Sequence, residues 1–383
     1  MAHVYVHVPF CVRRCSYCDF SIAVRKRIPV DDYVSAILKD FQQHSERIDG
    51  FESLYFGGGT PSLLPASAIA ELVHELTQTI RNPQSAIRNA VANPQSAIRN
   101  AEVTLEANPE DVTSDNARAW AAAGINRISL GAQSFDDRVL HWMHRSHDAA
   151  RVGAAVRALR DAGIANISLD LIFGLPEELQ RDWGRDVEAA IDLEPTHLSL
   201  YGLTVEHRTP LDRWISRGAT QPPDEGRYAD EYLAAHEWLA AVGYEFYEVS
   251  NAALTGFRSR HNSAYWSGAP YLGLGPAAHS FDGRTRRWNL SAWEAYRRAI
   301  AEGRSPVEAE EVLTGEQREL ERTYLALRTT EGIALRRPPP PLAALWARQG
   351  WVVRQDDRFK CTPHGWLRLD ALVRDLTANV VPG

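Results

Sequence analysis

The sequence has no apolar run long enough to cross a membrane and no excess of positive charge. None of its 383 residues lies in an uninterrupted apolar stretch of about 18 residues, and no charged segment followed by an apolar core opens the chain. Lysine and arginine total 42 against 49 aspartate and glutamate, which gives a formal net charge of −7. A polyanion has no global electrostatic attraction to such a chain, so we expect no nucleic-acid binding. We expect a cytoplasmic protein without stable membrane insertion.

Cysteine is also scarce, and its distribution is uneven. The chain has four cysteines, and three of them, Cys11, Cys15 and Cys18, fall within eight residues, while Cys361 lies near the other end. Three thiols in one short loop cannot all pair with one another, which argues against a disulfide framework. The cluster predicts a metal or redox site in a reducing compartment. The remaining composition, with 44% hydrophobic and 24% charged residues, is typical of a folded globular protein.

Short apolar runs alternate with amphipathic stretches through most of the chain. One predicted helix ends at Gly124 and another at Gly163. Strands that alternate with helices predict parallel βαβ units, whose functional side chains gather at the carboxyl ends of the strands. The runs with the character of buried strands are 4–8, 53–56, 103–107, 128–130, 167–172 and 198–203.

Two further features predict how the chain is divided. The string NPQSAIRNA occurs twice within 81–101, so we interpret this segment as a duplicated surface-loop insertion. Later in the chain the alternation of predicted strands and helices ends, and helical stretches and a hairpin-like segment at 351–361 follow. We therefore predict a barrel with its extension over 1–305 and a small helical, wing-like C-terminal domain over 306–383.

The CxxxCxxC spacing directly after the first predicted strand is the strongest chemical signal. Thiolates at Cys11, Cys15 and Cys18 can each bind a different iron of a [4Fe–4S] cube, which leaves the fourth iron open to a substrate or cofactor. A zinc site completed by His7 or Cys361 is the alternative, although the paired CxxC spacing common in zinc sites is missing. Both hypotheses place a metal on this loop.

Glycine-rich and polar residues follow the later strands. Residues 57–60 come after the second strand, where the absence of side chains lets a ligand approach the backbone closely. Glu106, Gln133 and Asp170 lie at the ends of the next three strands and would face the same mouth of a barrel. Each of these residues alone is equally compatible with a turn, a cap or a solvated loop.

These motifs, in this order, resemble those of the radical S-adenosylmethionine (SAM) enzymes of the oxygen-independent coproporphyrinogen III oxidase type. The strings that carry the resemblance are CxxxCxxC, GGGTP at 57–61, EANP at 106–109, GAQS at 131–134 and DLIFGLP at 170–176. The resemblance covers essentially the whole chain. It implies an α/β fold with a partial (β/α)6 radical SAM barrel, and a [4Fe–4S] cluster whose open iron is chelated by SAM. It also implies reductive cleavage of SAM to a 5′-deoxyadenosyl radical.

The family pattern implies roles for individual residues of this chain. Cys11, Cys15 and Cys18 would hold the cluster. Glu106 is expected to accept hydrogen bonds from a bound ammonium or ribose, with a cap as its alternative role. Arg145 is equally compatible with a solvated helix position. The residues expected around the cluster and the SAM bound to it are Tyr5, Tyr17, Gly58, Gly59, Thr60 and Glu106. Gln133, Arg145 and Asp170 match contacts to a second SAM in the oxidase.

Two departures from the oxidase pattern favour a haem-chaperone branch of this family, known as HemW. The oxidases have a further cysteine two positions after the third, where this chain has Phe20, and a longer segment ahead of the cluster. The string HNSAYW at 261–266 resembles the HNxxYW motif associated in that branch with haem binding. His261 and Tyr265 are therefore candidate haem ligands, because imidazole and phenolate can both bind haem iron. A structural histidine beside an aromatic core is the alternative for His261.

The resemblance thus implies a [4Fe–4S] protein that binds SAM and haem and delivers haem to haem-accepting proteins, with electrons from a separate donor. The enzymatic alternative is oxidative decarboxylation of two propionates of coproporphyrinogen III to vinyl groups. A zinc-stabilised binding barrel is the third alternative. The string GLGPAAHS at 273–280 matches a family turn near the cofactor, where His279 either contacts SAM or haem or serves the structure.

Overall fold

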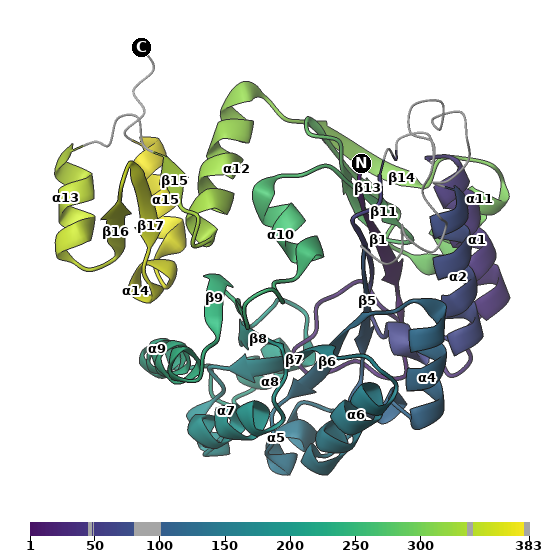
Figure 1. Cartoon of the computed structure of the whole chain (residues 1–383), viewed down its shortest axis with the longest axis horizontal. Helices are drawn as coiled ribbons and strands as arrows, with labels where there is room; N and C mark the ends of the chain where they lie inside the picture. Colours follow the sequence, from purple (N-terminus) through teal and green to yellow (C-terminus); the bar gives the residue numbers. More distant parts are fainter. Residues whose placement is uncertain (45–47, 49, 80–100, 335–339, 379–383) are drawn as a thin grey trace.

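The computed structural model, shown in Figure 1, describes residues 1–44, 48, 50–79, 101–334 and 340–378. The duplicated segment predicted at 81–101 lies outside the described residues, apart from Ala101. Among the described helices, none combines the length and the apolar character needed to span a bilayer.

Six neighbouring parallel strands form the middle of a twelve-stranded sheet and correspond to the six predicted strands. The strands are β1 (His3–Val8), β4 (Ser53–Gly58), β5 (Glu102–Ala107), β6 (Arg127–Gln133), β7 (Asn166–Phe173) and β8 (His197–Gly202). The main helices between them are α1 (Val30–Gln42), α2 (Ala66–Thr79), α4 (Ser114–Ala123), α5 (Asp137–Trp142), α6 (Ala149–Asp161) and α7 (Trp183–Asp192). These helices cover the outside of the curved sheet, which stays open (Figure 1). The predicted partial (β/α)6 barrel is confirmed.

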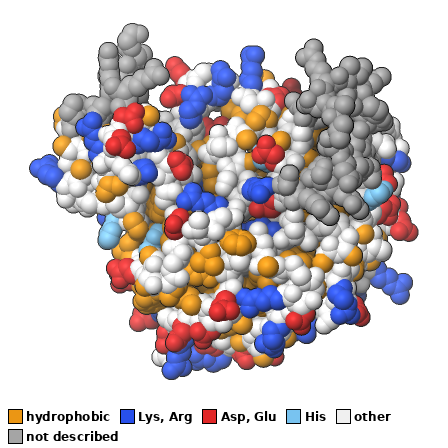
Figure 2. All heavy atoms as spheres, viewed as in Figure 1, with side chains coloured by type: hydrophobic (Ala, Val, Ile, Leu, Met, Phe, Trp, Pro, Cys, Tyr) orange, Lys and Arg blue, Asp and Glu red, His pale blue; other side chains and the backbone are white. Residues whose placement is uncertain are grey.

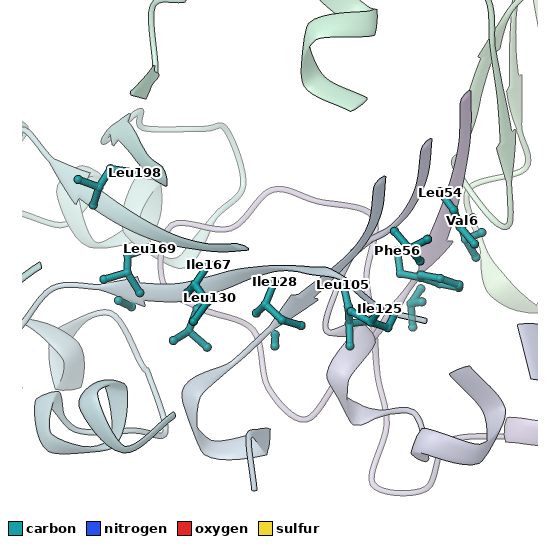
Figure 3. Packing of buried hydrophobic residues seen from close by; sticks show 14 of the residues in the cluster. Val6, Leu54, Phe56, Leu105, Ile125, Ile128, Leu130, Ile167, Leu169 and Leu198 are labelled. Carbon is teal, nitrogen blue, oxygen red and sulfur yellow. The ribbon is translucent and has the colours of Figure 1, made fainter. Parts of the chain in front are cut away.

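The strand pattern separates the apolar core from a polar interior. Leu54 and Phe56 on β4 and Leu169 on β7 belong to one buried cluster between the sheet and the outer helices (Figure 3). Because side chains alternate along a strand, the residues between them point to the other side of the sheet. Tyr55 and Asp170 occupy such positions, which places polar groups inside the barrel.

Local signals explain where the helices begin and end. The Thr113 side chain accepts a hydrogen bond from the backbone N–H of Asn116 and so caps α4, which ends at Gly124. Gly124 has a φ of 100°, a conformation that glycine adopts without a steric penalty. The end of α6 is followed by Gly163, with a φ of 87°. The helix ends predicted at these two glycines are confirmed.

Further strands extend the sheet beyond the barrel on both sides. On one side β11 (Tyr271–Leu274) lies parallel to β1, and β12, β13 and β14 follow in antiparallel order. The bounds of these three strands are His279–Phe281, Thr285–Asn289 and Val307–Val312. On the other side β10 (Asn251–Ala253) and β9 (Glu245–Glu248) form an antiparallel edge next to β8. Helix α10 (Arg260–Ser267) follows β10, α9 (Glu225–Ala241) precedes β9, and α11 (Trp293–Ala301) precedes β14.

The C-terminal part of the chain builds a small second sheet (Figure 1). Strands β15 (Ile333–Ala334), β17 (Arg358–Cys361) and β16 (Val352–Gln355) form it, and β16 and β17 make up the predicted hairpin. The helices of this part are α12 (Gly315–Arg328), α13 (Pro340–Arg348), α14 (Pro363–Trp366) and α15 (Leu369–Ala378). The domain division between 305 and 306 stays a prediction. Strand β14, which follows that boundary, pairs with β13 in the large sheet.

Candidate functional site

The cysteine loop lies over the carboxyl ends of the barrel strands. Cys11 ends the short strand β2 (Phe10–Cys11), which pairs with β3 (Ala23–Val24) on the far side of the loop. The Cys11 thiol lies 3.4 Å from the hydroxyl of Thr60, and Nη1 of Arg145 donates to the thiol of Cys15 across 3.6 Å. With Cys18, these two thiols line a cavity of about 440 Å³.

Most of the predicted site residues line this first cavity. They come from strands β4 to β7 and the segments after them and from the cysteine loop, because the carboxyl ends of parallel strands meet at one edge, and Arg145 comes from the segment after α5. The predicted residues that line it are Cys11, Cys15, Tyr17, Cys18, Gly58, Gly59, Thr60, Glu106, Gln133, Arg145 and Asp170. Tyr5, His261 and Tyr265 are not among its lining residues.

The glycines after β4 form a floor where side chains have no room. A Cβ atom on Gly59 would lie 2.8 Å from the carbonyl oxygen of Phe10, and one on Gly58 would lie 2.6 Å from the ring of His7. Gly58 also has a φ of 113°, which disfavours other residues. Its backbone N–H donates to Oε2 of Glu106 across 3.0 Å. The glycine run therefore keeps open backbone beside a carboxylate.

Glu106 is a carboxylate held by two donors at the cavity wall. Tyr55 donates to Oε1 across 2.8 Å, and the Gly58 N–H binds the other oxygen. Burial raises the pKa of Glu106 to about 7, because the charged form loses solvation there, and the nearby Asp170 adds to the rise. Glu106 thus changes its charge near neutral pH, where a bound cation would favour the carboxylate.

Arg145 is fixed inside the site rather than solvated on a helix. Its Nη2 donates to Oδ1 of Asn108 across 2.6 Å and to the carbonyl of Gly131 across 3.0 Å. Its Nε is buried and has no hydrogen-bond partner among the described residues. A buried N–H without a partner is costly, so this atom is free to bind a ligand oxygen.

Gln133 and Asp170 approach the cavity from two neighbouring strands. Gln133 has a φ of 67° and ends β6 where the register with β7 shifts, so its side chain is turned from the regular strand direction. Asp170 accepts hydrogen bonds of 3.0 Å from the hydroxyl of Ser129, and burial raises its pKa. The two side chains present amide and carboxylate oxygens to the same space.

Some residues of the cavity were not predicted as site residues. Asn108 holds Arg145, and Ser129 holds Asp170, so both position predicted residues. Tyr201 lies at the end of β8 and Glu110 follows β5, and both line the cavity. Their position at or just after the carboxyl end of a predicted strand is the signal that identifies them.

Cys361 lies away from the cysteine loop, as predicted. It ends strand β17, is buried in the apolar core of the C-terminal part and does not line the first cavity. Among the described residues, no three His, Cys, Asp or Glu side chains converge as ligands of a single metal ion.

A second, larger cavity of about 1050 Å³ lies behind the glycine floor, and Tyr5 and Tyr265 line it. The ring of Tyr5 lies against Gly57, and its hydroxyl lies 3.1 Å from Nδ1 of His7. The structure thus brings Tyr5 to the second cavity rather than to the cysteines.

His261 lies behind the wall of the second cavity. It is only 1% exposed, with Nδ1 at 2.8 Å from the hydroxyl of Ser53 and Nε2 at 2.9 Å from the hydroxyl of Tyr265. Its ring stacks on Tyr55 with 5.0 Å between the centroids. Both ring nitrogens therefore have partners in this conformation. Of the HNSAYW residues, Ser263, Tyr265 and Trp266 line the cavity.

The chain is similar to known proteins along most of its length. Residues 5–190 match the model of the radical SAM superfamily. The chain is 35% identical to the heme chaperone HemW of Mycobacterium tuberculosis, over 97% of this chain and 94% of that protein. It is 33% identical to the heme chaperone HemW of Bacillus subtilis, over 88% of this chain and 86% of that protein.

The fold is also that of a solved structure, the coproporphyrinogen III oxidase HemN of Escherichia coli. The two structures have a TM-score of 0.79 and 20% sequence identity, over 97% of this chain and 89% of that chain. At this identity the likeness shows a shared fold and no more. The relatives of higher identity, which match this chain over most of both lengths, show the family. The chain belongs to the HemW family of the radical SAM superfamily.

Proposed function

We propose that this protein is a haem chaperone: it holds a [4Fe–4S] cluster, binds SAM beside the cluster, and binds haem for delivery to haem proteins. The proposal rests on the sequence identity of about one third between this chain and the heme chaperones HemW, which extends over nearly the whole chain. Two separate cavities with different chemistry support it.

The cysteine loop fits a [4Fe–4S] cluster. Cys11, Cys15 and Cys18 are free thiols that line one cavity, and three thiolates are enough to bind three irons of a cube. Burial raises the pKa of Cys18 to about 11, so cluster binding would displace a proton from this thiol. A bound cluster would supply one-electron chemistry to SAM, with electrons from a separate donor.

The first cavity fits SAM, which carries a sulfonium, an ammonium and one carboxylate and is therefore a net cation. Asp19, Glu106, Glu110, Asp170 and Glu206 line the cavity against two arginines, Arg13 and Arg145. Glu106 would bind an ammonium or a ribose hydroxyl, and the glycine floor would let the ligand reach the backbone. The free Nε of Arg145 would bind a carboxylate oxygen.

Haem binding is assigned to the second cavity, beside the HNSAYW string. Tyr265 faces that cavity and His261 supports Tyr265 from behind. We expect the loaded protein to pass haem to acceptor proteins that lack it, as the relatives' name implies. Neither nucleic acid nor stable insertion into a membrane has a place in this function.

Coproporphyrinogen III oxidation is the second candidate, because the fold matches that of HemN. In the oxidase pattern a fourth cysteine stands where this chain has Phe20. The Phe20 side chain is 62% exposed and lines the first cavity, so the position faces the site. A phenylalanine there offers neither a thiolate nor a proton-transfer group.

One anaerobic assay separates the two candidates. Cluster-loaded, reduced protein is incubated with SAM and coproporphyrinogen III, and the tetrapyrroles are separated and quantified. We expect unchanged coproporphyrinogen, with protein that still binds haem in a parallel sample. Formation of protoporphyrinogen at many turnovers per chain would show that the protein is an oxidase and would overturn the chaperone proposal. Purified protein that holds zinc and assembles no cluster would instead support the zinc-stabilised barrel.

A further inference from the structure

The segment that carries the three cysteines also has a surplus of positive charge. Residues 11–27 include five basic residues and one acidic residue, Asp19, in a chain with a net charge of −7. On the face of the molecule shown in Figure 2, by comparison, basic and acidic side chains are mixed. A local excess of one charge attracts a partner of the opposite charge. The five basic residues are Arg13, Arg14, Arg25, Lys26 and Arg27.

Most of these basic side chains have no carboxylate of this chain to neutralise them. Among the described residues, Arg25 is the only one of the five with a carboxylate within ion-pair distance, that of Glu294 at 3.4 Å. The other exposed members of the five can therefore meet acidic groups of a partner without first breaking an ion pair. These members are Arg13, Lys26 and Arg27.

Three exposed apolar side chains lie among these charges, each beside a cysteine. Val12, which follows Cys11, is 54% exposed, and Phe20, two residues after Cys18, is 62% exposed. Val24 is 48% exposed and is the partner of Cys11 in the pairing of β2 with β3. Apolar groups with a charged rim are typical of protein interfaces, where aromatic residues and arginine are enriched. A partner bound there would lie directly over the cysteines.

Hydrogen bonds hold this loop in one conformation. The Arg14 guanidinium donates to the carbonyl of Cys18 across 2.9 Å, within the loop. The backbone of Ser16 donates to the carbonyl of Met143 across 3.2 Å and accepts from the N–H of Leu211 across 2.9 Å, which ties the loop to two other segments. A surface that is already ordered loses little conformational entropy when a partner binds. The apolar and basic groups are thus presented on a preformed face.

We propose that the exposed face of residues 11–27 is the docking surface for an acidic protein that carries single electrons and delivers them to the cluster. The inference rests on the proposed function, in which a separate donor supplies the electrons, and adds to it the place where the donor binds and the charge that it carries. We call this surface the cysteine-loop face, and its members are Val12, Arg13, Phe20, Val24, Arg25, Lys26 and Arg27.

The electron-transfer step balances with the carrier as the reductant. The reduced carrier gives up one electron and is oxidised, and the cluster is reduced from the 2+ to the 1+ state. No covalent bond forms or breaks, and no proton has to move. The carrier must leave after each electron, and weak electron-transfer complexes have small interfaces, below about 1,200 Å². A small apolar patch with unpaired basic residues around it suits such a brief contact, because opposite charges speed the encounter.

Two charge-reversal variants form a matched pair for this assignment. The double variant Lys26→Glu, Arg27→Glu changes two exposed residues of the cysteine-loop face that line neither cavity. The double variant Arg348→Glu, Arg354→Glu makes the same change in net charge at two exposed residues of the C-terminal part, which also line neither cavity. The probes are flavodoxin, an acidic carrier with a flavin, and cytochrome c, a basic carrier with covalently bound haem.

Binding and reduction are measured with the full-length, cluster-loaded protein in the absence of SAM. We expect oxidised flavodoxin to bind the wild type and the Arg348, Arg354 variant equally, and the Lys26, Arg27 variant about tenfold more weakly at low salt. Salt screens exposed charges, so this difference should shrink at about 0.5 M salt. The rate at which reduced flavodoxin reduces the cluster should fall by a similar factor, whereas dithionite should reduce all three proteins equally fast. Cytochrome c should not bind the wild type.

Several results would overturn the docking surface while leaving the proposed function intact. These are a wild type that does not bind flavodoxin, equal binding and reduction in the Lys26, Arg27 variant, or an equal loss in the Arg348, Arg354 variant. Vesicles of phosphatidylglycerol are a further probe. If they bind through Lys26 and Arg27 while flavodoxin does not bind, the face meets a membrane surface and the proposal is wrong. A protein that assembles no cluster would instead overturn the proposed function itself.

Discussion

Tyr55 donates a hydrogen bond of 2.8 Å to Oε1 of Glu106 and stacks its ring on His261. One tyrosine thus contacts the carboxylate of the first cavity and the buried histidine behind the second. The wall between the two cavities consists of Tyr55, Tyr5 and His7 with the glycines of β4. The two cavities share no lining residue.

Glu106→Gln should weaken SAM binding and leave the cluster in place. A charge-assisted hydrogen bond contributes roughly 1.5 to 3 kcal/mol, so we expect a loss of about 10- to 100-fold at pH 8. Because burial raises the pKa of Glu106 to about 7, the wild-type carboxylate is largely protonated at pH 6. The difference between the two proteins should therefore shrink at pH 6. Calorimetric SAM titrations at both pH values check this, and equal affinities at pH 8 would make Glu106 structural.

Replacing Cys11, Cys15 or Cys18 by alanine should abolish [4Fe–4S] assembly in each case, because three thiolates from one loop are needed for one cube. Cys361→Ala should assemble the cluster normally, since this thiol is packed in the C-terminal core. Iron and sulfide content after anaerobic reconstitution, together with EPR of the reduced protein, gives the answer. A loss in Cys361→Ala equal to the other three would refute the three-cysteine assignment.

The barrel was predictable because its signals are local. Each parallel strand is a short apolar run, and each helix end at Gly124 or Gly163 is encoded within a few residues. The cysteine spacing and the strand ends then place one cavity at the carboxyl edge of the sheet. Sequence reasoning succeeded there because the βαβ rule converts chain order into spatial order.

The second cavity was not predictable in this way. Its walls come from segments between 247 and 358 together with Tyr5 and His7, and no local pattern brings them together. The orientation of His261 depends on Ser53, which is 208 residues away in the sequence. The HNSAYW string lies on helix α10, but only long-range packing decides that Tyr265 lines the second cavity and that His261 does not.

His261→Ala should reduce haem affinity while cluster content and SAM binding stay near wild type, because the first cavity does not include this residue. The variant removes the proton acceptor of Tyr265 and leaves Ser53 with one partner fewer. His261→Gln can still accept a hydrogen bond from Tyr265, so its loss should be smaller. Soret titrations measure the affinities, and thermal unfolding serves as the control for a fold defect. Unchanged haem affinity in both variants would remove His261 from the haem site.

Asp40→Asn should remove a pH dependence of stability. Asp40 is fully buried, its Oδ2 accepts from Tyr296 across 2.7 Å, and burial raises its pKa to about 6. Because this pKa is raised, the folded state holds the proton more tightly, so the contribution of Asp40 is present at low pH and is lost as the pH rises through 6. Between pH 5 and pH 7 the free energy of unfolding of the wild type should fall by roughly 1 kcal/mol relative to that of the variant.

Urea unfolding at the two pH values measures this difference, and Asp31→Asn, at an exposed residue on the same helix, is the control. A stability difference between wild type and Asp40→Asn that stays constant with pH would contradict the shifted titration of Asp40.

The most direct test of the central claim is a haem titration of the full-length, cluster-loaded protein, followed by Soret absorbance. The account predicts saturable binding of one haem per chain, weakened by changes at the second cavity and unaffected by Glu106→Gln at the first. The absence of saturable haem binding, in protein whose cluster and SAM binding are intact, would contradict the haem-chaperone function.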